Sequence, residues 1–287
     1  MLRGFLWPTA LFLSLFAGST VGLLACATNP YTERSQLLLV SESQEMQLGA
    51  QAYEQVLKDP KLKISHDPRE VDPVKRVAAR IIEAAKQSRY ADTARKFDWE
   101  VSVIKDDKTM NAFALPGGKI AVYTGIFPVA KNEAGLAAIL GHEVTHALAR
   151  HGAERMSQGM LAQVGLEVAN IALATKTNPA AAQAVMAALG LGVNVGVLLP
   201  FSRSHESEAD HIGLLLAAQA GYDPHEAVHV WERMEQLSKG QPPQFLSTHP
   251  GHGTRIKQLE EWMPEALTYY QPQPGMQTAD LPFIQPR

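Results

Sequence analysis

Apolar residues recur with a helical period along most of the chain. A capping box of the S-x-x-Q type at residues 41–44 predicts a helix that continues to about Leu57. Asp72 and Pro73 fit the N-cap and the first position of a second helix, which extends to Arg89. Later helices are predicted over residues 134–150, 204–221, 224–237 and 253–263. Helix is therefore expected to dominate the fold.

Three short segments in the middle of the chain have the pattern of strands. Residues 97–103 alternate between apolar and polar side chains, which is typical of a half-buried strand. Residues 111–115 and 119–123 flank Pro116-Gly117-Gly118, which predicts two strands joined by a turn. The predicted fold class is α+β, mainly α with a small β-sheet.

Residues 179–200 form a stretch that carries no charge and is long enough to span a bilayer. The stretch is mainly Ala and Gly, contains Gln183 and Asn194, and has no aromatic or basic anchors at its ends. We expect a helical hairpin packed on the rest of the domain, and a membrane-inserted hairpin is the alternative.

Composition excludes several classes of protein. The chain has 287 residues, 46% of them apolar, which is too apolar for a disordered protein. The formal net charge is −3 and there is no long basic run, so no nucleic-acid partner is expected. The single cysteine, Cys26, excludes a disulfide scaffold.

The first residues have the pattern of a targeting signal. After Arg3 no charged residue occurs before Glu33, and residues 5–24 are an apolar run, which predicts a secretory signal with an uncleaved anchor as the alternative. The end of the run, Leu23-Leu24-Ala25-Cys26, resembles a bacterial lipobox, which implies lipidation of Cys26. Ala27 then favours delivery to the outer membrane, so the expected location is the periplasmic side of that membrane, with a lipid anchor.

The sequence contains two H-E-x-x-H segments, at residues 142–146 and 225–229. In a helix, histidines four residues apart lie only about 40° apart around the axis, so both rings can bind one Zn²⁺. The glutamate between them, Glu143 in the first copy, can take a proton from water. The spacing alone does not distinguish the two copies.

A downstream carboxylate distinguishes them. In thermolysin-like zinc peptidases the third ligand is a Glu on a later helix, followed four residues on by an Asp that orients a ligand histidine. Glu206 and Asp210 have this spacing after the first copy, whereas no such pair follows His229. The sequence therefore predicts zinc at the first copy, and His225 and His229 are expected to lie on a solvated helix start.

These residues belong to a wider resemblance. Several segments are similar to zinc peptidases of the HtpX and BepA type, in the Ste24-like family: residues 35–41, 111–118, 141–146, 202–210 and 248–250. The similarity runs from about residue 29 to 265. This chain lacks the membrane helices of HtpX-like relatives and the tetratricopeptide repeats of BepA. The resemblance implies a gluzincin-type domain with one zinc ion per chain.

The resemblance also implies roles for individual residues. His142, His146 and Glu206 are the expected zinc ligands, Glu143 is the general base and proton donor, and Asp210 orients a ligand histidine.

Further residues are expected close to the metal or to the substrate. His249 and Arg255 match positions near the metal, and either could stabilise the oxyanion. Alternatively, His249 could occupy the open metal position at rest. The strand containing Asn111, Ala112, Phe113 and Ala114 suits an extended substrate that adds to a sheet edge.

The predicted organisation has four parts: a lipoprotein signal peptide (1–25), a linker (26–40), the zinc metallopeptidase domain (41–268) and a Pro-rich disordered tail (269–287). The predicted function is that of a zinc metalloendopeptidase facing the periplasm. Its expected substrates are misfolded or unassembled envelope proteins, and the outer-membrane assembly machinery is a candidate partner. The alternative is a non-catalytic chaperone or assembly factor for outer-membrane proteins that uses the same groove.

Overall fold

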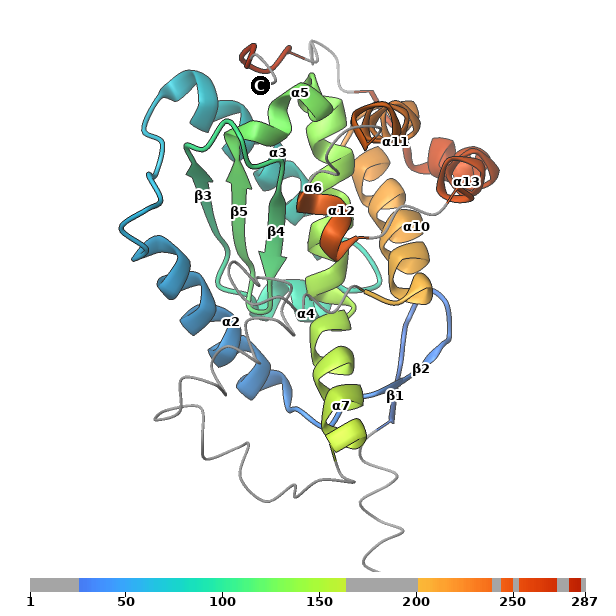
Figure 1. Ribbon diagram of the computed structural model, residues 1–287. Coiled ribbons are helices and arrows are strands. Elements are labelled where there is room, and N and C mark those ends of the chain that lie inside the picture. The colour runs from blue at the N-terminus through green and yellow to red at the C-terminus, as the bar shows by residue number, and fades with distance from the viewer. Residues whose placement is uncertain (1–25, 164–200, 239–243, 250–252, 273–278, 285–287) are drawn as a thin grey trace, which may run out of the picture.

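Helix α6 (Glu133–Leu148) lies at the centre of the domain, between a small sheet on one side and further helices on the other (Figure 1). The computed structural model describes residues 26–163, 201–238, 244–249, 253–272 and 279–284. The other helices are α2 (Glu42–Leu57), α3 (Pro68–Lys86), α4 (Ala91–Lys96), α5 (Phe127–Ala130), α7 (His151–Gln163), α10 (Arg203–Gln219), α11 (His225–Ser238), α12 (Gln244–Thr248) and α13 (Arg255–Tyr269). The expected fold class, mainly α with a small β-sheet, is confirmed.

The central sheet has the strand order β3-β5-β4 and is built from β3 (Glu100–Ile104), β4 (Ala112–Leu115) and β5 (Lys119–Tyr123). β3 runs parallel to β5, whereas β4 pairs with β5 as an antiparallel hairpin. The connecting turn needs glycine, because Gly117 and Gly118 have φ values of 82° and 86°. β4 is thus an edge strand, and it lies against α6.

Helices α6 and α10 pack closely through two glycines. A Cβ atom on Gly213 would lie 2.6 Å from the backbone nitrogen of His142, and one on Gly141 would lie 2.5 Å from the carbonyl oxygen of Gly213. No larger residue fits at either position without moving a backbone. This contact brings the N-terminal half of α10 next to the H-E-x-x-H residues of α6.

The predicted linker, residues 26–40, contains regular structure. β1 (Cys26–Thr28) and β2 (Ser35–Leu37) form an antiparallel hairpin, and the buried side chain of Asn29 accepts from the backbone N–H of Tyr31 in its turn. The hairpin packs next to α7. Its short strands alternate too briefly for a periodic pattern to reveal them.

The C-terminal tail also contributes to the fold. The sequence predicts disorder over residues 269–287, but α13 continues to Tyr269, and Leu281 and Ile284 are buried in the core. Leu281 donates a backbone hydrogen bond to Lys131, and Glu133 donates one to Ala279, just before and at the first residue of α6. The tail therefore stabilises the start of the central helix.

Two helix boundaries differ from the sequence prediction, both at proline. α3 begins at Pro68 with Asp67 as its N-cap, so Pro73 lies inside the helix rather than at its start. α13 continues through Pro264, where a helix end was predicted. Buried residues continue on either side of each proline: Glu70 precedes Pro73 in α3 and Val74 and Val77 follow it, and Met263 precedes Pro264 in α13 and Ala266 follows it.

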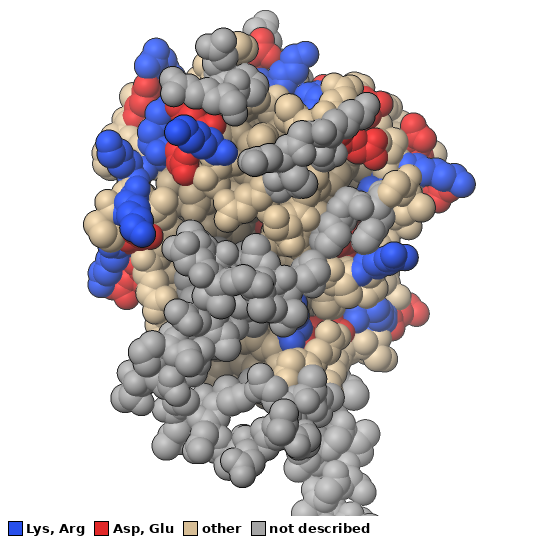
Figure 2. Space-filling view, in the orientation of Figure 1, with Lys and Arg blue, Asp and Glu red and all other residues tan. Residues whose placement is uncertain are grey.

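The uncharged stretch at residues 179–200 lies outside the described residues, so the predicted hairpin and its membrane-inserted alternative stay untested. Within the described part of the chain, no helix is long and apolar enough to cross a bilayer. The visible surface carries Lys and Arg intermingled with Asp and Glu around its rim, with no single-sign field (Figure 2).

Candidate metal centre

Four buried side chains converge between α6, α10 and the residue that follows α12. His142 and His146 project from one face of α6, Glu206 comes from the first turn of α10, and His249 follows Thr248. One ligand atom from each of the four lies within 4.8 Å of the others. None of the four residues is more than 5% exposed. The structure therefore brings together the three predicted ligands and places His249 with them.

The nitrogen atoms of this cluster face one another at short distances. Nε2 of His142 lies 3.1 Å from Nε2 of His146 and 3.2 Å from Nδ1 of His249. The Glu206 carboxylate completes the group, with Oε1 3.0 Å from Nδ1 of His249 and 3.5 Å from Nε2 of His146. Three imidazoles and one carboxylate in this arrangement form the donor set that zinc binds.

The protonation states also fit a metal ion. Burial lowers the pKa of His146 well below its ordinary value, so its ring is neutral. Burial raises the pKa of Glu206, but His249 and Arg255 outweigh this effect and hold the pKa at about 2, so the carboxylate is ionised. The nitrogen and oxygen atoms of the cluster point their lone pairs at one another, and a positive ion between them would bind these lone pairs. The residues present therefore fit a zinc ion.

Glu143 has the properties of a general base. Its side chain is buried, burial raises its pKa, and its Oε1 has no hydrogen-bond partner. Nε2 of His249 lies 3.4 Å from this oxygen. The carboxylate thus sits beside the cluster without being a member of it, where it can exchange protons with a water molecule.

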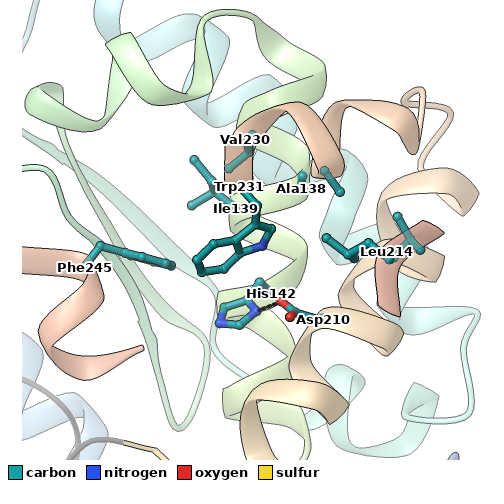
Figure 3. Close-up of a pocket in the computed structure, with 10 residues that line it drawn as sticks. Ala138, Ile139, His142, Asp210, Leu214, Val230, Trp231 and Phe245 are labelled. Carbon is teal, nitrogen blue, oxygen red and sulfur yellow. Dashed lines mark hydrogen bonds and ion pairs between the residues drawn. The ribbon is translucent and has the colours of Figure 1, made fainter. Parts of the chain in front are cut away.

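Asp210 orients His142 as the spacing predicts. Its Oδ1 lies 2.9 Å from Nδ1 of His142, which leaves Nε2 of that ring directed at the cluster (Figure 3). Ala138, Leu214 and Trp231 line a small cavity on this side of His142, and these side chains limit the access of water to the pair.

Arg255 lies beside the cluster, where the resemblance implies, and its side chain contacts carboxylates. Its guanidinium donates to both oxygens of Asp210, at 2.6 and 2.5 Å, and to Oε2 of Glu206, at 2.7 Å. The group also lies 3.5 Å above the ring centre of Trp231. The guanidinium thus holds two carboxylates of the site, and the predicted part of Arg255 in oxyanion stabilisation stays a prediction.

The predicted substrate strand lies next to the centre. Asn111 accepts a backbone hydrogen bond from Tyr123, so in the antiparallel ladder Phe113 pairs with β5 while the backbone groups of Ala112 and Ala114 face outward. An interaction with the backbone of Ala114 lowers the pKa of Glu143, against the effect of burial. The outer edge of β4 thus points toward the general base.

The second H-E-x-x-H segment does not take part in the centre. The side chains of His225 and His229 are 54% and 51% exposed, and they pair with Asp223 and Glu226. Within the described ranges, neither histidine belongs to a group of three side chains that could hold a metal. The sequence-based choice between the two copies is confirmed.

Sequence reasoning missed two residues near the centre. His151 is fully buried, and its Nδ1 lies 3.0 Å from Nδ1 of His146. Burial lowers the pKa of His151 to about 4, so the ring is neutral. Glu208 contacts the other side of that ring. No motif signals either residue, because the contacts arise only where α7 and α10 meet.

The fold and the site together define a zinc metallopeptidase in which a helical H-E-x-x-H and a glutamate from a second helix hold the metal. The chain belongs to Peptidase family M48, whose sequence pattern matches residues 71–263.

Several relatives are called mitochondrial metalloendopeptidase OMA1. The protein from Schizosaccharomyces pombe is 38% identical over 243 residues, which is 83% of this chain and 66% of the relative. The Saccharomyces cerevisiae protein is 31% identical over 252 residues, 84% of this chain and 70% of the relative. The beta-barrel assembly-enhancing protease of Escherichia coli is 28% identical over 258 residues, 86% of this chain and 50% of that protein.

These comparisons correct two expectations. The metallopeptidase family is confirmed, but the relatives with higher identity are OMA1 proteins rather than the BepA type named from the sequence. The predicted location on the periplasmic side of the outer membrane is contradicted, because those relatives carry mitochondrial names. The zinc cofactor and the hydrolase class are confirmed by the family and by the donor set.

Proposed function

We propose that this chain is an endopeptidase that cleaves extended segments of unfolded or unassembled proteins. One observation carries the proposal: Glu143, the candidate general base, lies between a zinc-binding cluster and the outer edge of β4, with which no other strand of the described residues pairs. An edge strand recognises any extended peptide through its backbone groups, so it suits substrates that have lost their fold.

The mechanism follows from the positions of the side chains. The outward-facing carbonyl groups of Ala112 and Ala114 would accept hydrogen bonds from a substrate that adds as a strand, with a peptide bond beside Glu143, while the N–H groups of the two alanines are held by Asn111 and Glu143. A zinc ion held by His142, His146 and Glu206 would supply a Lewis acid for the scissile carbonyl group. Glu143 would accept a proton from the attacking water and later donate it to the leaving amine.

The surroundings of Glu143 support catalysis over simple binding of clients. The carboxylate is buried, burial raises its pKa, and its Oε1 lies 3.4 Å from Nε2 of His249 beside the cluster, which suits a group that exchanges protons. A chaperone that only held unfolded chains in this groove would not need a base beside the metal.

The test compares cleavage of an unfolded polypeptide, reduced and alkylated casein, by the wild type and by Glu143→Gln. The wild type should produce fragments and lose this activity with a zinc chelator, whereas Glu143→Gln should bind zinc but produce none. Glu226→Gln, in the second H-E-x-x-H segment, is the matched control and should cleave normally. Binding of casein without cleavage by the zinc-loaded wild type would support the non-catalytic alternative.

His249 is proposed to keep the site latent. Its Nδ1 lies within the ligand cluster and its Nε2 faces Glu143, so the ring fills the space that the attacking water needs. Replacement by alanine should then raise the basal cleavage of casein and the cleavage of the chain by itself. A fall in kcat of about 10²–10³ with unchanged zinc content would contradict latency and assign His249 to oxyanion stabilisation.

Lipidation of Cys26 remains a separate proposal. The proposal rests on the lipobox-like segment Leu23-Leu24-Ala25-Cys26. Mass spectrometry of the chain after expression with bacterial lipoprotein-processing enzymes should find an acylated N-terminus at Cys26. Cys26→Ser should lack the modification, and an unmodified wild-type Cys26 would contradict the proposal.

A further inference from the structure

The ligand His146 has a chain of buried polar contacts on the side away from the cluster. Its Nδ1 lies 3.0 Å from Nδ1 of His151, and Nε2 of His151 lies 2.9 Å from Oε2 of Glu208. His151 is fully buried, and Glu208 is 5% exposed. The contacts therefore form a continuous path from a metal ligand to a carboxylate that is not a ligand.

The carboxylate at the end of this path is held by the N-terminal hairpin. Arg34 donates to Oε1 and Oε2 of Glu208, both at 2.9 Å, and Thr32 donates a further hydrogen bond to Oε1. The same guanidinium donates to both oxygens of Glu154 in α7, at 2.7 and 2.8 Å. Arg34 thus joins three elements that are distant in sequence.

A break in the helix places His151 in this path. In a continuous helix, a residue five positions after His146 would point about 140° away from it. Instead, α6 ends at Leu148, and Arg150 has a φ of 57°, a conformation that is unfavourable for a residue with a side chain. The new helix α7 then begins at His151, whose ring faces back toward His146.

We propose that His151, Glu208 and Arg34 are positioning residues for the metal ligand His146. When Nε2 of His146 binds the metal, the ring carries its proton on Nδ1 and donates it to Nδ1 of His151. Nε2–H of His151 then donates to Glu208, which Arg34 holds in place. The relay fixes both the tautomer and the orientation of His146.

The other ligand histidine is supported in a parallel way. His142 is oriented directly by Asp210, and Asp210 is held by Arg255. Each ligand histidine is thus backed by a carboxylate and an arginine, with His151 as an inserted spacer on one side. The inference rests on the proposed function only in taking the cluster as a zinc site, and it makes the hairpin formed by β1 and β2 part of that site.

Another ion pair near the junction of α6 and α7, with a similar burial to that of Glu208 and Arg34, provides the control. Glu45 of α2 accepts from Arg150 at 2.7 Å, and the side chains of this pair are 3% and 22% exposed, against 5% and 25% for Glu208 and Arg34. The pair also joins the N-terminal part of the chain to the junction of α6 and α7, but it does not contact a metal ligand. Glu45→Gln therefore removes a similar charge at the same helix junction, leaves each contact of the relay in place, and leaves Arg150 its hydrogen bond to the carbonyl oxygen of Val40.

The experiment measures the zinc dissociation constant of the full chain by competition with a chelating dye. Glu208→Gln and His151→Phe should weaken zinc binding about 10- to 100-fold, and Glu45→Gln should leave it within about twofold. The absorption bands of the Co²⁺-substituted protein should change in Glu208→Gln and not in Glu45→Gln. Arg34→Lys should retain more affinity than Arg34→Met, because it keeps a charged donor for Glu208.

Thermal unfolding of the zinc-free variants separates positioning from general stability. Wild-type affinity in Glu208→Gln, or an equal loss of affinity in Glu208→Gln and Glu45→Gln, would overturn the relay. Failure of the wild-type chain to bind zinc would instead overturn the proposed metal centre. The two failures are distinguishable, because failure of the metal centre is seen in the wild-type chain, whereas failure of the relay is seen only in the variants.

Discussion

The two H-E-x-x-H segments have the same spacing, and both lie in helices, yet only one of them forms part of a metal centre. In α6, His142 and His146 are 5% and 4% exposed and face Glu206 and His249. In α11, the side chains of His225 and His229 are 54% and 51% exposed and pair with neighbouring acidic residues.

The difference arises from what packs against each helix. α6 is covered by the sheet and by α10, which supplies a carboxylate at the level of its histidines. The histidines of α11 instead lie in its first turns and face solvent. The spacing of a motif thus sets the direction of two side chains, but a metal site also needs the ligand that another element supplies.

The largest expected effect comes from removing a ligand in each copy. His146→Ala should lose stoichiometric zinc and all cleavage of casein, because two protein ligands and His249 cannot replace the missing imidazole in the same geometry. His229→Ala should retain both properties. Metal analysis by mass spectrometry checks this prediction, and full zinc in His146→Ala with loss in His229→Ala would reverse the assignment of the two copies.

The glutamates of the two H-E-x-x-H segments should also differ in their importance for catalysis. Glu143→Gln should lower kcat/KM by about 10²–10⁴, which is the usual contribution of a positioned base, with zinc content unchanged. Glu226→Gln should change kcat/KM less than twofold, because Glu226 pairs with Arg233 and His229, neither of which belongs to the cluster. Equal activities of the two variants would show that Glu143 is not the base.

Asp210, which orients the ligand His142 in the first H-E-x-x-H segment, can be replaced without changing a ligand. Asp210→Asn should lower zinc affinity about 10-fold or more, because the amide accepts more weakly from His142 and leaves Arg255 with one fewer charged partner. Competition with a chelating dye measures the change. Asp223→Asn, at the start of α11, should leave the affinity as in the wild type, and a loss there would contradict the comparison.

The smallest expected effect comes from the close packing of α10 against α6, the helix that carries the first H-E-x-x-H segment. Gly213→Ala would place a methyl group 2.6 Å from the backbone of His142, so it should destabilise the fold by about 1–3 kcal/mol and weaken zinc binding slightly. Gly159→Ala in α7 is the control, since a Cβ atom there meets nothing within 4 Å. Thermal unfolding with and without zinc checks both variants, and equal stabilities would show that α6 and α10 can separate at little cost.

Much of the site could be predicted because it depends on neighbours in sequence. The spacing of His142 and His146, and that of Glu206 and Asp210, follows from the period of a helix, and the structure confirms both pairs. The strands on either side of Pro116-Gly117-Gly118 and the capping box at residue 41 are local features of the same kind.

Other features were decided by tertiary packing. Pro73 and Pro264 are typical of helix starts or ends, but both helices continue through them because buried residues extend on either side. The composition of the tail predicts disorder at residues 279–284, but Leu281 and Ile284 are buried in the core and the tail bonds to the backbone at the start of α6. The local preference of a residue for a helix or a turn contributes little free energy, and the burial of apolar area outweighs this contribution.

The sequence by itself determined the helical fold class and pointed to His142, His146, Glu206 and Glu143, since these follow from a period or a spacing along the chain and from the resemblance to known zinc peptidases. Only the tertiary structure decided that Arg255 holds carboxylates and that His151 connects to Arg34 through Glu208. Arg34 and Glu208 are 174 residues apart in sequence. A contact between such distant residues depends on how whole helices cross, and no local pattern records that crossing.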